Sequence, residues 1–430
     1  MKSRISVNLF FLVGLALFAC QSGQVQTTTV EPSPPIQEIL PSEQPTNQPI
    51  IVQPSPIVQT SIPVSTKVSR RGTYIQSGFA LQIPRSRHTG TLLPNGNVLF
   101  IGGSLEPDDF VADEELFNPL TGSSTWIAPL HTPRHGHTTT LLQDGRILVV
   151  GGYSLPQQWL GDAEVYDPIS DTWTVIPPLY PHGTEHTATL MKDGRILVVG
   201  GCIGSGICTN RVEIFDPKTD SWKEATPLKS DRASHTAQLL INGRVLIAGG
   251  TGAIGGVPLD GTALTYNPKD NSWTTTSDMN NPRLFAKSVQ LSDGKILVTG
   301  GILASDPSNQ TITNTSEIYD PAKNRWIPAA SLSQARYAFV LVALPNGKVL
   351  AIGGTRNWEC CWMEDSFISD IESYDPVTDQ WSITGKMPQP RAYATGILLS
   401  NGMVWIAGGQ SNQSGLTFSP DTWLIDASNP

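Results

Sequence analysis

Charged residues are scarce in this 430-residue chain, and basic residues are the scarcer kind. Only 15% of the residues are charged, and 28 Lys and Arg stand against 37 Asp and Glu, which gives a formal net charge of −9. Proteins that recognise nucleic acids use clustered Lys and Arg to neutralise phosphates. We therefore expect no nucleic-acid partner, and a partner that is neutral or is recognised by local charge.

The chain also lacks any long segment with the apolar period of a helix. It contains 39 Gly and 34 Pro, which interrupt helices and favour turns. A chain of this length would ordinarily form two or three domains, but sequence repeats can close into a single body. The composition indicates a turn-rich, all-β fold.

Recognisable catalytic motifs are missing as well. The sequence contains no nucleophile with a nearby base, no phosphate-binding loop and no spacing typical of metal ligands. We therefore assign no catalytic residue, no metal and no cofactor from the sequence, and binding is favoured over catalysis.

What the chain does contain is repetition. The nine residues DGRILVVGG stand at 144–152 and again at 193–201. A double glycine after a short apolar run occurs seven times at intervals of roughly fifty residues, a period typical of solenoids, arrays and propellers. These pairs are Gly102-Gly103, Gly151-Gly152, Gly200-Gly201, Gly249-Gly250, Gly300-Gly301, Gly353-Gly354 and Gly408-Gly409.

One repeat, residues 133–179, predicts four antiparallel strands. Residues 137–142 and 146–150 flank Asp144-Gly145, a dipeptide typical of hairpin turns. After a variable loop, a third strand is expected at 163–166, then a turn at Asp167-Pro168 and a fourth strand from Trp173. A four-stranded antiparallel sheet in every repeat is the building block of a β-propeller.

Two aromatic columns accompany the glycines. Tyr or Phe followed by Asp or Asn and then Pro recurs in six repeats, and a tryptophan follows each time, as in Tyr166 and Trp173. Double glycine, aromatic and tryptophan in this order resemble the kelch repeat, and the resemblance covers residues 73–430. It implies an all-β, seven-bladed kelch-type β-propeller, a fold that hosts enzymes and binding proteins alike.

The seventh repeat ends before its fourth strand. Asp421 to Asp426 matches a third strand, and the chain stops shortly afterwards. A candidate for the missing strand, Tyr74 to Leu81, precedes the first repeat. We predict that this N-terminal segment closes the ring as the outer strand of the seventh blade and leaves no exposed sheet edge.

Three further columns carry ionisable residues. Glutamates two residues before the aromatic predict structural, charge-assisted hydrogen bonds. Histidines at 88, 137, 186 and 235 could suggest a metal, but later repeats place Ala or Phe there, which indicates packing. An arginine column includes Arg336 and is interrupted by Gly183; it could line a positive rim or anchor backbone carbonyls.

The N-terminal region predicts export. Lys2 and Arg4 precede an apolar run too short to span a bilayer comfortably, as in a secretion signal. The run ends in Leu17-Phe18-Ala19-Cys20, which resembles the bacterial lipobox, although an ordinary signal peptide is the alternative. We expect a lipoprotein signal peptide at 1–19, lipidation of Cys20, a disordered Pro/Thr/Gln-rich tether at 20–72 and a propeller at 73–430.

This organisation implies a protein attached by a lipid anchor to a bacterial cell membrane, with its propeller outside the cytoplasm. In such an exported protein, Cys202 and Cys208 are expected to form a small disulfide loop. Cys360 and Cys361 are adjacent, and a bond between them would force a sharp turn. Pairing between the two loops stays open as an alternative.

Galactose oxidase carries similar kelch-like blades, so copper chemistry has to be considered. That family uses a Tyr-His pair and a tyrosine cross-linked to a cysteine. No tyrosine of this chain is followed by His, and no cysteine falls in a predicted blade strand. Copper radical chemistry is therefore not expected, whereas a mutarotase-like site needs only an Arg and a carboxylate at the propeller mouth.

The loops between the second and third strands gather at one mouth of the ring and supply the candidate binding residues. Tryptophan faces beside carboxylates suit stacking and hydroxyl recognition, although the tryptophans could instead cap the channel. The candidates are Trp159, Arg336, Trp358, Glu359, Trp362, Glu364 and Asp365. We expect a monomeric, non-catalytic module for an unknown protein or glycan; the alternative is a carbohydrate-active enzyme, mutarotase-like or lyase-like.

Overall fold

The computed structural model describes residues 74–106, 109–156, 158–204, 207–252, 261–303, 311–357, 366–411 and 417–426. The predicted signal peptide and tether, 1–19 and 20–72, lie outside these ranges, and so does Cys20. No helix in the described part of the chain is long and apolar enough to cross a membrane.

The described residues form seven four-stranded antiparallel sheets, which we call blades one to seven. The innermost strand of each blade is short and follows the arginine and histidine columns. These inner strands are β2 (Thr89–Leu92), β8 (Thr138–Leu141), β14 (Thr187–Leu190), β18 (Thr236–Leu239), β23 (Lys287–Gln290), β29 (Val340–Ala343) and β33 (Thr395–Leu398).

The second strand of each blade is the apolar run that leads into the double glycine. These strands are β3 (Val98–Ile101), β9 (Ile147–Val150), β15 (Ile196–Val199), β19 (Val245–Ala248), β24 (Ile296–Thr299), β30 (Val349–Ile352) and β34 (Val404–Ala407). All are fully buried, as expected for strands with a neighbouring blade on each face.

The third and fourth strands complete each sheet outward from the axis. The third strands are β6 (Glu115–Phe117), β12 (Ala163–Asp167), β16 (Val212–Asp216), β20 (Ala263–Asn267), β27 (Ser316–Asp320), β31 (Asp370–Asp375) and β37 (Asp421–Ile425). The fourth strands are β7 (Ser124–Trp126), β13 (Thr172–Val175), β17 (Ser221–Glu224), β21 (Ser272–Thr275), β28 (Arg325–Ala329), β32 (Gln380–Lys386) and β1 (Tyr74–Ala80).

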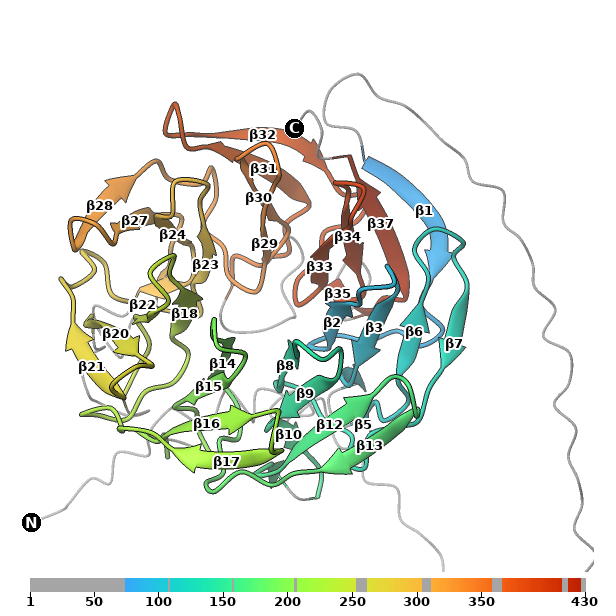
Figure 1. Ribbon diagram of the computed structural model, residues 1–430. Coiled ribbons are helices and arrows are strands. Elements are labelled where there is room, and N and C mark those ends of the chain that lie inside the picture. The colour runs from blue at the N-terminus through green and yellow to red at the C-terminus, as the bar shows by residue number, and fades with distance from the viewer. Residues whose placement is uncertain are drawn as a thin grey trace, which may run out of the picture.

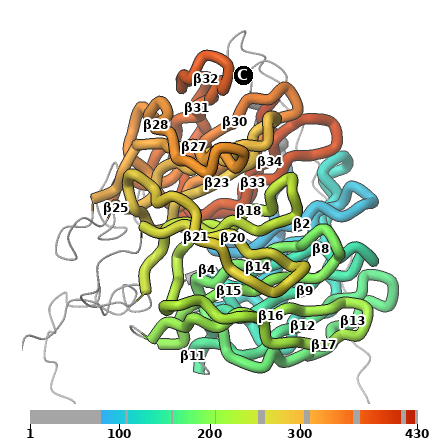
Figure 2. The backbone as a smooth tube through the Cα atoms, turned by 60° about the vertical axis from the view of Figure 1, so that its left-hand side comes forward, coloured from blue at the N-terminus to red at the C-terminus, as the bar shows by residue number. Residues whose placement is uncertain are grey.

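The ring is closed by the N-terminal strand. β1 pairs antiparallel with β37, so blade seven has the order β1-β37-β34-β33. Each inner strand lies beside that of the next blade, and β33 lies beside β2. Figure 1 shows the blades in chain order around one axis, with β1 against β37, and Figure 2 shows the same progression obliquely.

The hydrophobic core lies between neighbouring blades. In one cluster, Leu99 and Ile101 of blade one pack against Ile147 and Trp173 of blade two. The tryptophan column also joins blades, because Trp173 Nε1 donates to the carbonyl oxygen of Ala128 at 2.7 Å. The aromatic columns are therefore structural.

The double glycine is required where the second strand leaves its sheet. Gly151 has a φ of 61° and Gly152 a φ of 108°. A Cβ on Gly151 would lie 2.4 Å from the carbonyl oxygen of Gly183 in the next blade. Because that oxygen belongs to the backbone, only glycine fits at this position. The repeated motif is thus a point of close contact between blades.

Candidate functional site

The arginine column anchors the backbone inside the propeller. Arg336 Nη1 donates to the carbonyl oxygen of Gly353 at 3.1 Å, and Nη2 is paired with the carboxylate of Glu372. The Arg336 side chain is 0% exposed. It therefore acts as an anchor and presents no surface to a ligand, which corrects its assignment as a binding residue.

The glutamate column completes these anchors. Glu164 is fully buried, pairs with Arg134, and accepts backbone N–H bonds from His131 at 3.0 Å and Thr132 at 3.4 Å. Glu317 takes the same part in blade five by pairing with Arg283. The charge-assisted hydrogen bonds expected from the sequence are present.

In blade three, where Gly183 interrupts the arginine column, the preceding residue His182 takes over both contacts. Its Nδ1 lies 2.8 Å from the carbonyl oxygen of Gly200, and its Nε2 lies 2.7 Å from the carboxylate of Glu213. His182 is fully buried. The sequence did not reveal this substitution, because it is displaced by one position.

The histidine column joins consecutive blades through threonines. Hydrogen bonds connect Thr89 Oγ1 with His137 Nε2 at 2.9 Å and Thr138 Oγ1 with His186 Nε2 at 2.8 Å. Burial lowers the pKa of His186 to about 3, so the ring is neutral. In the described ranges, no group of three or more His, Cys, Asp or Glu side chains is placed to hold a metal ion.

The strand register defines the two ends of the ring. The first residue of each inner strand pairs with the last residue of the second strand, as in Thr138 with Val150. The starts of the inner strands and the connections between second and third strands therefore share one end, which we call the loop face. The hairpin turns at the opposite end form the turn face.

Seven equivalent residues surround the channel at the loop face. Each precedes the histidine column and has a left-handed backbone, with φ between 52° and 67°. We call this set the mouth ring: Arg87, Gly136, Glu185, Ser234, Phe285, Ala338 and Tyr393. Backbone hydrogen bonds link several neighbouring members, as from Ser234 N to Glu185 O at 2.9 Å and from Tyr393 N to Ala338 O at 2.9 Å.

A second set of repeated positions with a left-handed backbone provides a comparison for the residue types of the mouth ring. In five blades the turn before the tryptophan also has a positive φ, and there the residue is always Asp or Asn: Asp171, Asp220, Asn271, Asn324 and Asp379. These residue types tolerate the conformation best after glycine. The mouth ring instead holds Arg, Glu, Phe and Tyr, so its side chains do not follow the preference of the backbone.

Three ionisable side chains from alternate blades interact at the loop face. Glu185, from blade three, interacts electrostatically with Arg87 of blade one and with Lys287 of blade five. Burial raises the pKa of Glu185, and the two cations oppose that shift. Lys287, the first residue of β23, is exposed.

The other half of the mouth ring is aromatic. The Arg87 guanidinium lies 4.5 Å from the centroid of the Tyr393 ring, and the Tyr393 hydroxyl donates to the Tyr337 hydroxyl at 3.1 Å. Phe285 and Ala338 pack against the cluster of Leu284, Ile302 and Tyr337. The mouth therefore has a charged half and an aromatic half.

Trp159 lies at the loop face in a small aromatic group between blades one and two. It pairs in the hairpin of β10 (Tyr153–Ser154) and β11 (Gln158–Trp159), and its ring lies 5.5 Å from that of Tyr153. His135 stacks on Phe110 with centroids 5.1 Å apart. Arg87 contributes to the lowered pKa of His135, after burial, so this group adjoins the mouth ring.

The other five predicted binding residues fall outside the described ranges. Trp358, Glu359, Trp362, Glu364 and Asp365 belong to the segment between Asn357 and Ser366, together with Cys360 and Cys361. Their assignments stay predictions. Cys202 and Cys208 are joined by a disulfide, as the sequence predicted.

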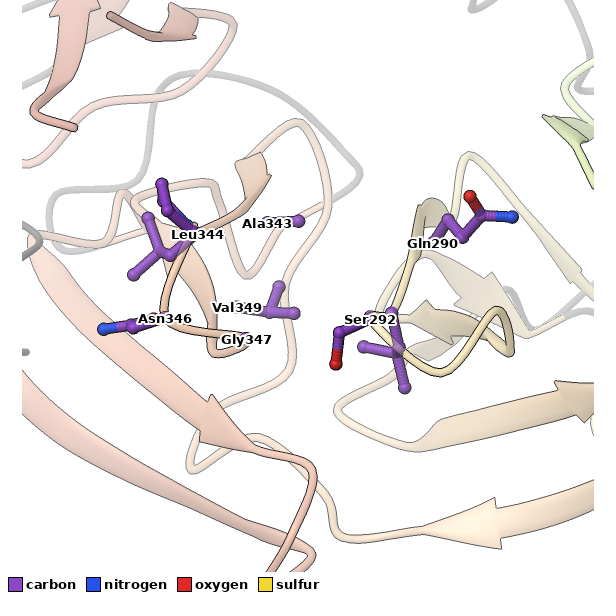
Figure 3. A pocket seen from close by; sticks show the side chains of 9 residues that line it. Gln290, Ser292, Ala343, Leu344, Asn346, Gly347 and Val349 are labelled. Atoms are coloured by element: carbon purple, nitrogen blue, oxygen red, sulfur yellow. The ribbon is translucent and has the colours of Figure 1, made fainter. Parts of the chain in front are cut away.

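A pocket of about 320 Å³ lies at the turn face between blades five and six. Figure 3 shows Gln290 and Ser292 on one side of it, with Leu344, Asn346 and Val349 on the other. None of the residues that line it is ionisable. The pocket offers polar and apolar contacts but no charged group. The loop face is therefore the stronger candidate for a functional site.

The model of the KLHDC2/KLHL20/DRC7 Kelch-repeats domain matches residues 74–250 and 185–409 of the chain. The chain belongs to the kelch-repeat family. Together the two matches span residues 74–409 and include all seven double glycines, in agreement with the resemblance seen in the sequence.

Curated relatives match this kelch chain over shorter segments. It is 32% identical to Kelch-like protein 36 of Bos taurus over 28% of this chain and 18% of that protein. It is 28% identical to Kelch-like protein terF of Aspergillus terreus over 34% of this chain and 31% of that protein. The matched segments thus span less than a third of either relative.

A solved structure described as a novel fungal alcohol oxidase of the AA5 family, in complex with copper, aligns with this kelch propeller. The TM-score is 0.67, and the alignment covers 84% of this chain and 76% of the oxidase at 21% identity. At this identity the likeness shows a shared fold alone.

Proposed function

We propose that this kelch propeller is a recognition module that binds a ligand or protein partner at the loop face, centred on the mouth ring. The observation that carries the proposal is the contrast between its two left-handed columns. Asp and Asn suit the backbone in the outer turns, whereas the mouth ring holds Arg87, Glu185, Phe285 and Tyr393 at similar φ angles. Uncommon backbone conformations with unsuited residue types are concentrated at functional sites.

The proposal includes a place in the cell. The apolar run before Cys20 and the Pro-rich stretch after it support export and attachment by a lipid anchor to a bacterial membrane. Metabolic labelling with a palmitate analogue tests this. We expect label on the wild-type chain and none on Cys20→Ser; equal labelling of both would contradict the anchor.

Binding at the mouth ring is tested with a panel of sugars, amino acids and short peptides against the immobilised full chain. Tyr393→Ser removes an aromatic wall of the mouth, whereas Val377→Ser changes an exposed residue of the turn face. We expect Tyr393→Ser to weaken a bound ligand by at least about tenfold and Val377→Ser to leave it unchanged. The reverse pattern would place the site on the turn face.

One observation favours the second candidate, a carbohydrate-active enzyme. Burial raises the pKa of the Glu185 carboxyl group, which also interacts with Arg87 and Lys287, and carboxyl groups with raised pKa values serve as general acids or bases. NMR of a bound reducing sugar distinguishes the candidates. Accelerated anomeric exchange that is lost in Glu185→Gln would establish the enzyme, and binding without exchange supports the recognition module.

A further inference from the structure

The turns between the third and fourth strands of blades one to six share one construction. Each begins with Asp or Asn followed by Pro, and the side-chain oxygen of the first residue accepts a hydrogen bond from the backbone N–H of the third. Third strands run from the loop face toward the turn face. The third residue of each turn is therefore a tip on the turn face, and we call these six residues the tips.

The tip position does not require an apolar side chain. The tips of blades three, four and five are Lys218, Lys269 and Ala322, and those of blades one, two and six are Leu120, Ile169 and Val377. The three large apolar tips are 79%, 93% and 91% exposed. Single exposed apolar residues are ordinary, but three at equivalent positions on one face, where the turn also accepts lysine, indicate contact with another surface.

The segment that precedes the propeller joins it at the same face. Tyr74 of β1 pairs with Ile425 of β37, and Ile425 also pairs with Val404 at the start of β34. Second strands such as β34 begin at the turn face, directly after their hairpin turns. Tyr74 therefore lies at the turn face, on the outer strand of blade seven, which Figure 1 shows at the rim of the ring. Cys20 precedes this point in the chain.

The turns of the two blades nearest to Tyr74 carry no charge. Residues 94–97 and 118–123 in blade one and 400–403 in blade seven contain no ionisable side chain. The corresponding turns of blade three, 192–195 and 216–221, contain six ionisable side chains. The turn face is therefore uneven, and its charged turns lie away from the point where the chain enters the propeller.

The blades with large apolar tips flank that point. Blade seven lies between blades six and one, because β33 contacts both β29 and β2. Blades six, seven, one and two are thus consecutive, and we call their side of the turn face the exit sector. Aspartates beside its tips are bound within the protein, as Asp171 Oδ1 accepts from Tyr166 Oη at 2.9 Å and from Ala128 N at 3.0 Å.

We propose that the exit sector docks on the lipid bilayer that holds the anchor, with Leu120, Ile169 and Val377 inserted at the boundary between headgroups and acyl chains. That boundary takes up protruding apolar side chains to a depth of about 5–10 Å and needs no complementary pocket. The assignment rests on the lipid anchor of the proposed function. It directs the loop face, with its mouth ring, away from the membrane.

The test uses the lipidated full chain in vesicles of phosphatidylethanolamine and phosphatidylglycerol whose acyl chains are brominated, because bromine quenches fluorophores that reach the acyl region. The fluorophore is introduced as Leu120→dansylalanine or, for comparison, as Ile207→dansylalanine on the loop face, where Ile207 is 61% exposed. We expect quenching at position 120 to be at least about twofold stronger than at position 207.

Ile169→Ser combined with Val377→Ser removes the other two large apolar tips and should reduce quenching at position 120 by about twofold or more. Ile207→Ser is the matched control and should leave it unchanged, and melting curves verify that each variant folds. Vesicle flotation reports the anchor separately. A chain that floats but is quenched equally at 120 and 207, or is unaffected by the double substitution, would overturn docking alone. A chain that does not float would overturn anchor and docking together.

Discussion

At the residue scale, His182 takes the place of an arginine. It contacts the Gly200 carbonyl and the buried Glu213 carboxylate, as Arg134 contacts Gly151 and Glu164. Among the described residues, His182→Ala leaves Glu213 with the backbone donors of Leu179 and Tyr180 alone. Because a buried carboxylate then loses a partner, we expect the free energy of unfolding to fall by about 2–3 kcal/mol.

His131 provides the matched control for that substitution. Its Nδ1 also lies 2.7 Å from a buried glutamate, Glu164, but the ring is 54% exposed and Glu164 keeps Arg134 as a partner. His131→Ala should cost less than about 1 kcal/mol in urea unfolding. Equal losses for the two variants would show that His182 is not an anchor.

Glu114 makes stability depend on pH. Burial raises its pKa from 4.5 to about 8, although Arg85 opposes the shift. The unfolded chain loses this proton near pH 4.5, whereas the folded protein keeps it up to about pH 8. Unfolding therefore releases a proton between these values, and the contribution of Glu114 to stability falls as the pH rises through that window.

Glu114→Gln replaces the carboxyl group by a neutral amide of similar shape and should remove this dependence. We expect the melting temperature of the variant, relative to the wild type, to be higher at pH 8 than at pH 5. Melting curves at both pH values measure the difference. A difference of the same size at pH 5 and pH 8 would contradict the assignment of the titrating group.

At the element scale, β1 is the closing strand of the ring. It covers β37, and Phe79 packs edge-on against Phe117 of blade one with centroids 6.4 Å apart. Deletion of residues 73–81 exposes the edge of β37 and should lower and broaden the thermal transition. Deletion of residues 21–70 removes no described strand and is the control; an unchanged melting curve after the first deletion would refute closure.

The repeated elements could be read from the sequence because each uses a residue type that its backbone requires. Asp144-Gly145 marks a hairpin turn, and the double glycine at Gly151 marks a close contact between blades. The strands expected at 137–142 and 163–166 begin and end within one residue of β8 and β12. These elements could be recognised because the same residue types recur in every repeat.

The mouth ring could not be predicted in the same way. Its seven positions share a backbone conformation but no residue type, so no column of identical letters marks them. Arg87, Glu185 and Lys287 are also far apart in the chain, and only the closed ring allows Glu185 to interact with both cations. Arg336 was misassigned because its burial depends on Gly353 and Glu372, which are distant in sequence.

On the scale of the whole molecule, structural and variable columns are separated in space. The arginine, glutamate, glycine and tryptophan columns bind the blades to one another. The mouth ring lies where all seven blades meet, and its side chains vary from blade to blade. A rigid scaffold that presents variable side chains around one axis is an arrangement suited to recognition.

The central claim is that Glu185, the carboxylate of the mouth ring, serves binding and not folding, and one measurement tests it without a known ligand. Glu185 and Asp379 have similar left-handed backbones, with φ of 63° and 52°. Asp379 also accepts hydrogen bonds from Tyr374 Oη at 2.8 Å and Ala330 N at 2.9 Å. Glycine relieves the backbone at either site. Asp379→Gly removes two hydrogen bonds of normal length, whereas Glu185→Gly removes a single long one, from Ser234 Oγ at 3.4 Å.

The free energy of unfolding in urea should therefore fall by about 1 kcal/mol or more for Asp379→Gly. For Glu185→Gly it should stay within about 0.5 kcal/mol of the wild type or rise, because glycine removes a left-handed strain of about 1 kcal/mol. A loss for Glu185→Gly as large as that for Asp379→Gly would show that Glu185 is part of the scaffold, and would contradict the account.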